Sequence, residues 1–332
     1  MSTCFMKKKS NDLYESYNEF GSITLFTPTY NRAYFLVRIY ECLLSQTNKH
    51  FVWIIVNDGS QDDTGELCCQ FVNENRIPIL YICKENGGKH SAFKAALAEC
   101  KTEYFQCMDD DDIYDSKSVD FYLNAWTKIR EEQREDIGAI RTIARRTDGT
   151  FSVDKLTAIT IDGQEDLSTL EMNYVRKIHQ ENWTCYRTDA LRSIDLFPSN
   201  YWLAGQHTFF LESIWQGRFA RKYLCRYIYT SLREYTDDAE VSLIRSNKTR
   251  KHYLNMFINS KMVLDEQLDY ICKNPCNLIK SIVLVQLLRG YLKFPLKDLL
   301  RNTESTSLKF AYLLSSPIGF FGEQVVTKRS TK

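Results

Sequence analysis

Apolar and polar residues alternate in blocks over residues 22–112, and the block lengths predict alternating strands and helices. Continuous apolar runs of strand length occupy 22–27, 51–56, 77–83 and 103–108. The segments between these runs carry apolar residues at helical spacing, over 33–46, 62–72 and 88–100. Buried strands separated by amphipathic helices are typical of βαβ units and of a parallel sheet.

The pattern changes after residue 112. Residues 113–245 mix short helical and strand-like segments without a long linker, so we assign them to the same domain. Beyond residue 246 the spacing predicts helices over 253–272 and 278–294, and residues 273–332 hold ten Lys/Arg against three Asp/Glu. We expect an N-terminal extension (1–21), an α/β domain (22–245, with halves 22–125 and 126–245) and a basic helical region (246–332).

Composition narrows the class of protein. With 44% hydrophobic residues over 332 positions and a net charge of +1, the chain can bury a large core and shows no overall positive field for nucleic acid. Eleven cysteines without framework spacing indicate free thiols. No apolar segment follows the first basic residues, and the densest apolar run, 281–288, is shorter than a membrane span. These features favour a cytoplasmic protein.

The predicted strands end in polar loops. In a parallel sheet, ligands bind beyond the carboxyl ends of the strands. These ends fall at 27–31, 57–60, 84–90 and 109–112. We therefore expect one site at this edge.

Four consecutive aspartates, Asp109 to Asp112, close the last of these strands. Side chains alternate along an extended chain, so Asp109 and Asp111 point one way while Asp110 and Asp112 point the other. Asp109 and Asp111 could share Mg²⁺ or Mn²⁺, with a substrate's phosphates supplying further ligands. A hydrated acidic turn is the competing interpretation, and the neighbouring polar loops favour the metal.

Two of these neighbouring loops suit a nucleotide. Asp58 can accept hydrogen bonds from a base or ribose, and Gly59 permits close backbone approach. The segment 86–90, Asn-Gly-Gly-Lys-His, precedes a helix whose N-terminus favours an anion, and Lys89 adds a charge. Taken alone, the 57–60 loop is better explained as an ordinary turn, and the 86–90 loop fits a turn and an anion site equally well. Together with the aspartates they indicate a site for a nucleoside diphosphate and a metal.

Four segments, FTPTYNR at 26–32, VNDGS at 56–60, ENGGKH at 85–90 and MDDDD at 108–112, resemble glycosyltransferase family 2 in order and spacing. This resemblance implies a GT-A fold: a Rossmann-like, mainly parallel sheet flanked by helices, here followed by a C-terminal helical extension. It also implies an inverting transferase that takes a sugar from a nucleotide donor.

The resemblance implies roles for individual residues. Asp109 and Asp111 would bind Mn²⁺ or Mg²⁺. The implied donor-binding residues are Thr27, Pro28, Thr29, Arg32, Asp58, Gly59, Ser60, Gly88, Lys89, Asp109, Asp110 and Arg141.

The chain departs from the family pattern at the general base. Where one alignment places the family's acidic pair, this chain has Gln206-His207; where another places an acid, it has Leu211, next to Glu212. His207 and Glu212 are the candidate catalytic bases. Imidazole suits the role because it titrates near neutral pH.

We expect a metal-dependent hexosyltransferase that uses a nucleotide sugar, with a UDP-sugar favoured, and a saccharide or lipid-linked acceptor in surface polysaccharide or glycoconjugate synthesis. The basic C-terminal helices suggest peripheral contact with the inner membrane face, or else pack with a hydrated basic face. A non-catalytic nucleotide-sugar-binding module that has lost its base is the alternative. A nucleotidyltransferase fits less well because 27–32 contains no glycine, and an oxidoreductase would need G-x-G-x-x-G after the first strand.

Overall fold

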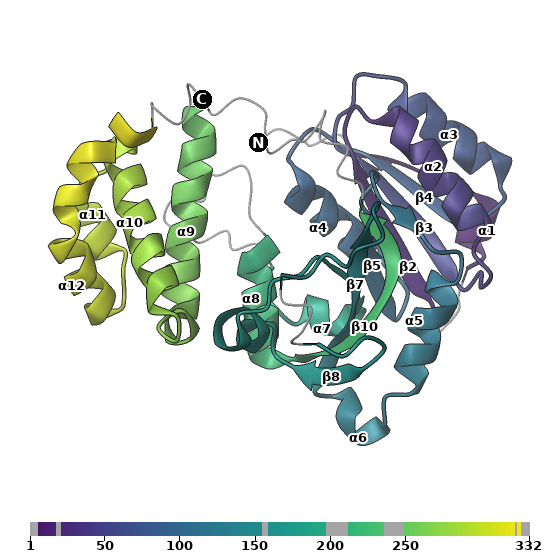
Figure 1. The fold of residues 1–332 in the computed structure, drawn as a ribbon. Coiled ribbons are helices and arrows are strands. Elements are labelled where there is room, and N and C mark those ends of the chain that lie inside the picture. Colours follow the sequence, from purple (N-terminus) through teal and green to yellow (C-terminus); the bar gives the residue numbers. More distant parts are fainter. Residues whose placement is uncertain are drawn as a thin grey trace. The chain divides into compact units, whose positions relative to one another are not determined.

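The computed structural model describes residues 6–17, 21–154, 159–196, 212–235, 249–322 and 324–326. The chain divides into two compact units. The first comprises 1–169, 178–194 and 222–238, and the second comprises 170–177, 195–221 and 239–332. Figure 1 shows the elements of both.

Within the described residues, one sheet organises the first unit, in the order β1-β4-β3-β2-β5-β9-β7-β10-β6, with β8 paired to β10. The strands are β1 (Lys7–Ser10), β2 (Ile23–Thr29), β3 (Phe51–Asn57), β4 (Ile79–Cys83), β5 (Tyr104–Cys107), β6 (Ile113–Tyr114), β7 (Ile137–Arg146), β8 (Gln164–Leu167), β9 (Asn182–Arg187) and β10 (Leu224–Tyr235). Strands β2 to β5 pair in parallel, as the block pattern predicts, whereas β9 runs antiparallel to β5 and β7. The sheet is therefore parallel at the βαβ units and mixed beyond them.

The helices of the first unit are α1 (Asp12–Glu15), α2 (Ala33–Leu44), α3 (Thr64–Glu74), α4 (Lys89–Glu99), α5 (Ser118–Thr127), α6 (Glu131–Arg134) and α7 (Thr188–Arg192). Aromatic contacts show that helices cover both faces of the parallel strands. Tyr40 of α2 stacks on Phe71 of α3, with ring centroids 4.1 Å apart, and both lie near Trp53 of β3. Phe93 of α4 packs on the opposite face, against Phe26 and Phe105. Burial on both faces explains why these strands are continuously apolar.

The second unit is helical over its described residues. It contains the π-helix η2 (Glu171–Arg176), α8 (Glu212–Lys222), α9 (Arg250–Ile271), α10 (Pro275–Leu292), α11 (Leu296–Arg301), α12 (Thr306–Leu314) and the 3₁₀ helix η5 (Ser316–Phe321). A separate apolar core unites these helices, including Phe257, Val285, Leu299 and Tyr312. None of the described helices is both long enough and apolar enough to span a bilayer.

Candidate donor site at the carboxyl edge of the sheet

The loops that follow β2 and β3 are joined to each other by hydrogen bonds. The Asn31 amide N–H donates to Ser60 Oγ over 2.8 Å, and the Gln61 N–H donates to Asn31 Oδ1 over 2.8 Å. The Ser60 N–H donates in turn to Asn57 Oδ1 over 2.8 Å. Asn31 has a φ of 54°, in the left-handed region that asparagine tolerates better than most residues. These contacts set the positions of the loops that follow β2 and β3.

Asp58 anchors the glycine loop. Its buried carboxylate accepts from the Gly87 N–H at 3.0 and 3.1 Å and from the Gly88 N–H at 2.6 Å, and it also pairs with buried Lys84. Gly59 has a φ of 85°, and a Cβ there would lie 2.9 Å from the Asn86 nitrogen. The Asp58 side chain therefore holds the 84–88 loop in this structure. Lys84 had no role in the sequence interpretation, although its place at the end of a strand could have suggested one.

Thr27 and Thr29 both lie within β2, which continues two residues past the predicted strand end at residue 27. Both are buried, and Thr27 Oγ1 accepts a hydrogen bond from the Trp53 indole N–H over 3.0 Å. Pro28 between them is partly exposed. The Thr27 side chain thus packs inside the sheet, and the loop proper begins closer to Arg32.

The alternation expected of the aspartates is present in their burial. The side chains of Asp109 and Asp111 are 37% and 41% exposed, whereas those of Asp110 and Asp112 are 5% and 3% exposed. Two acids are available to a ligand and two are enclosed by protein.

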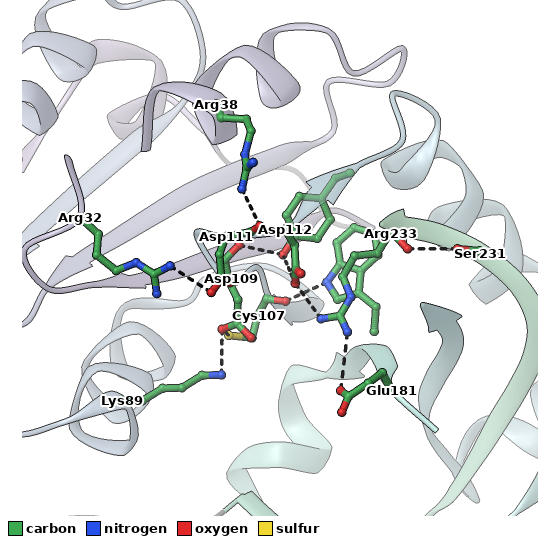
Figure 2. A network of polar contacts seen from close by, with 12 residues as sticks. Arg32, Arg38, Lys89, Cys107, Asp109, Asp111, Asp112, Glu181, Ser231 and Arg233 are labelled. Atoms are coloured by element: carbon green, nitrogen blue, oxygen red, sulfur yellow. Dashed lines mark hydrogen bonds and ion pairs between the residues drawn. The ribbon is translucent and has the colours of Figure 1, made fainter. Parts of the chain in front are cut away.

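Cations from separate elements contact this row, as Figure 2 shows. Lys89 Nζ lies 2.8 Å from Asp109 Oδ1, and Arg32 lies 3.0 Å from Asp111 Oδ2 and 3.2 Å from Asp110 Oδ1. Removal from water would raise the pKa of Asp109, but the Lys89 ammonium, together with Arg233 and a hydrogen bond from the Cys107 thiol, holds that pKa below its usual range. Burial raises the pKa of Asp110 to about 7, despite Arg32.

Two further arginines were not identified from the sequence. Arg233 of β10 lies 2.9 Å from Asp112 Oδ2, and both side chains are buried. Arg38 of α2 donates to the Asp111 carbonyl oxygen over 2.5 Å. Arg38 belongs to a helix whose start lies directly after the first loop, but Arg233 is 121 residues from its partner and no local pattern could have connected them.

Arg141 lies on β7, and its hydrogen bonds are to tyrosines and not to the aspartate loop. It is buried, and its Nη1 and Nη2 atoms donate to the hydroxyls of Tyr227 and Tyr186 over 3.4 and 3.5 Å. Of the candidate bases, Glu212 is exposed at the start of α8, and Gln216 Nε2 donates to it over 3.5 Å. His207 lies outside the described residues.

Asp109 and Asp111 offer carboxylate oxygens to a divalent cation. Among the residues that the structure describes, no three His, Cys, Asp or Glu side chains gather into a complete metal site. Asp109 and Asp111 are half-exposed hard oxygen donors at one edge, which suits an ion that takes its remaining ligands from a diphosphate and water. The residues therefore fit a substrate-shared Mg²⁺ or Mn²⁺ and do not form an all-protein cage.

This sheet, with its polar carboxyl edge and flanking helices, defines the GT-A class of fold. Residues 24–149 match the model of glycosyl transferase family 2, so this part of the chain is similar to that family. An uncharacterized glycosyltransferase of Rickettsia prowazekii (strain Madrid E) is 31% identical over 107 residues, 32% of each chain. A teichoic acid poly(glycerol phosphate) polymerase of Staphylococcus epidermidis is 33% identical over 104 residues, 31% of this chain and 14% of that protein.

The fold extends beyond the matched segment. The crystal structure of S. aureus TarS residues 1–349 in complex with UDP-GlcNAc superimposes with a TM-score of 0.57 at 14% identity, covering 93% of this chain and 92% of that one. At this identity the likeness concerns the fold. The present chain aligns with about a third or less of the length of the curated relatives.

Proposed function

We propose that this protein is an inverting glycosyltransferase that transfers a hexosyl group from a nucleoside-diphosphate sugar to an acceptor hydroxyl in surface polysaccharide or glycoconjugate synthesis. The observation that carries the proposal is the set of ion pairs at the carboxyl edge of the sheet. Arg32 and Lys89 come from separate loops and both pair with half-exposed aspartates, Asp111 and Asp109. The family match, and the similarity in fold to TarS, which was crystallised with UDP-GlcNAc, support a nucleotide donor and favour a UDP-sugar.

The ion pairs suggest how a donor is bound. A diphosphate brings negative charge to the place where Arg32 and Lys89 now face aspartates, so these cations can exchange a carboxylate partner for phosphate oxygens. Asp109 and Asp111 would hold the divalent cation, which supplies charge stabilisation for the leaving diphosphate when it is bound. The Gly87 and Gly88 amides are already committed to Asp58, which keeps the loop before α4 in place for the donor.

Transfer by direct displacement inverts the anomeric centre. An acceptor oxygen bonds to the anomeric carbon as the bond from that carbon to the diphosphate oxygen breaks, and the acceptor proton passes to a base. His207 and Glu212 are the candidates for this base. The family resemblance implies an acidic pair at 206–207, where this chain has Gln206-His207. The nucleoside diphosphate leaves with the charge that Arg32 and Lys89 stabilise.

A thermal-shift screen of nucleotide sugars with Mn²⁺ tests donor binding, because a ligand of the native state raises the melting temperature by mass action. The correct donor should stabilise the wild type and should not stabilise Asp111→Ala. Glu132→Ala is the control: Glu132 is an exposed acid outside the proposed site, so this variant should be stabilised like the wild type. No stabilisation by any nucleotide sugar would contradict the proposal. Equal stabilisation of Asp111→Ala would remove the metal from it.

Transfer to a saccharide or lipid-linked acceptor, followed by NMR of the product's anomeric configuration, tests the reaction itself. Inversion is expected, and His207→Ala and Glu212→Ala compared separately should identify the base. Donor binding without transfer or donor hydrolysis over a broad acceptor panel would favour the alternative, a binding module that has lost its base.

A further inference from the structure

Large apolar side chains face water at the end of the second unit. Phe310, Leu313 and Leu314 of α12 are 62%, 50% and 69% exposed, and Phe320 and Phe321 of η5 are 86% and 56% exposed. We call these five residues the C-terminal apolar face. The three residues of α12 are spaced i, i+3 and i+4, so they share one side of that helix. The helix buries Leu308 and Tyr312 instead.

The backbone that carries this face is firmly packed. A Cβ on Gly290 of α10 would lie 1.7 Å from the Gly319 oxygen, and one on Gly322 would lie 2.2 Å from the Leu287 oxygen. Such clearances require glycine, so η5 rests directly on the backbone of α10. The two exposed phenylalanines, Phe320 and Phe321, are thus held by close tertiary contact.

Hydrogen bonds from α10 hold the same turn. Buried Gln286 donates through Nε2 to the Tyr312 carbonyl over 2.6 Å and to Ser315 Oγ over 3.2 Å. Arg289 Nη2 donates to the Ser316 carbonyl over 3.2 Å. Three polar contacts therefore fix the junction of α12 and η5, where the apolar side chains emerge.

An exposed apolar face of this kind marks an interaction surface, because removing large apolar side chains from water stabilises an assembly. The positive charge of residues 273–332 indicates which partner this face binds. Ten Lys/Arg and three Asp/Glu occur over 273–332, and the side chains of Lys273, Lys280, Lys293, Lys297 and Arg301 are exposed. A second copy would bring this positive charge against itself. An anionic bilayer offers both apolar depth and opposite charge.

We propose that the C-terminal apolar face inserts into the headgroup layer of an anionic membrane, with Phe320 and Phe321 as the anchors and exposed lysines and arginines of residues 273–332 on lipid headgroups. The inference rests on the proposed function only in its purpose, since peripheral docking would bring the enzyme to a lipid-linked acceptor. Membrane binding itself needs neither donor nor catalysis.

Vesicle flotation of the full chain tests the proposal. Wild-type protein should float with vesicles of phosphatidylcholine and phosphatidylglycerol, and weakly with phosphatidylcholine alone. The double variants F320S/F321S and L313S/L314S should each lower the partition coefficient by about tenfold or more. Ile279→Ser, which alters a side chain 62% exposed on α10 outside the face, should float like wild type.

Three results would overturn the proposal: no flotation of the wild type with anionic vesicles, unchanged flotation of both double variants, or a concentration-dependent dimer in analytical ultracentrifugation that F320S/F321S abolishes. The last would identify a second copy as the occupant. Because flotation uses no donor and the thermal-shift screen uses no vesicle, either hypothesis can fail while the other stands.

Discussion

The carboxyl edge of the sheet and the C-terminal apolar face depart from ordinary burial in opposite ways. At the edge, charged side chains are drawn inward: Asp112, Arg233, Asp58 and Lys84 are all buried in pairs. At the C-terminal apolar face, the phenylalanine and leucine side chains are exposed to solvent. Burying charge and exposing apolar surface both cost free energy. The comparison is consistent with the two proposals, which assign a polar ligand to the first region and an apolar phase to the second.

Asp111→Ala separates ligand binding from folding at the edge. Its carboxylate is 41% exposed and is a proposed metal ligand, so its loss should lower the rate of sugar transfer by about 10³-fold or more while leaving the melting temperature within a few degrees of wild type. Steady-state kinetics and thermal melting of the same preparation make the measurement. Normal turnover in the variant, or in excess chelator, would contradict the metal's role.

Asp112→Asn should have the opposite character. It removes the carboxylate 2.9 Å from the buried Arg233 guanidinium and leaves only the exposed Glu181 carboxylate at 3.9 Å, which we expect to lower the free energy of unfolding by about 3–5 kcal/mol. Asp111→Asn, at the exposed neighbour, is the matched control and should cost less than about 1 kcal/mol. Urea denaturation of both variants decides the matter. Equal losses would show that burial does not distinguish alternate aspartates.

Gly59→Ala tests the close approach of the second loop to the glycine loop. The φ of 85° and the 2.9 Å clearance to Asn86 both oppose a side chain, so we expect a loss of about 1–3 kcal/mol and weaker donor binding. Gly149→Ala is the control, because its φ is 84° but nothing lies within 4 Å of its Cβ position. An equal loss in both variants would mean that only backbone strain matters at residue 59.

His90, at the start of α4, should make a smaller and pH-dependent contribution. Burial is the main cause that lowers the pKa of His90 below 6.5, with Lys84 and Lys94 adding to the effect and Asp58 opposing it. Folding thus favours neutral imidazole. The contribution of His90 to stability should be constant above pH 6.5 and fall as the pH drops below that value toward the folded pKa. Thermal melts at several pH values should show a steeper acid loss in the wild type than in His90→Gln.

F320S/F321S should have the smallest effect on folding. Both side chains face water, so the free energy of unfolding should change by no more than about 0.5 kcal/mol per substitution, even though membrane binding is lost. Denaturation in the absence of lipid measures this. A large loss of stability would mean that the phenylalanines are part of the fold, and the contrast with the edge would disappear.

Much of the edge was predictable from the sequence because its signals are local. The apolar runs predicted β2 to β5, the spacing predicted the helices between them, and the rule for parallel strands brought the four loops to one edge. The expected alternation of Asp109 to Asp112 appears in their burial, although they form a turn between β5 and β6 and not the extended segment that the prediction assumed. At the second unit, residue spacing predicted α9 and α10 to within a few residues. Each of these depends on neighbours within a few positions along the chain.

Contacts between distant segments required the tertiary structure. The sequence does not reveal that Arg233 pairs with Asp112, that Lys84 and two amides occupy the Asp58 carboxylate, or that Thr27 packs under Trp53. Nor does it distinguish the exposed Phe320 from the buried Tyr312, since both occur in similar apolar surroundings. Periodicity determines which side of an element is apolar, whereas the packing of remote elements determines which charges are enclosed and which apolar side remains uncovered.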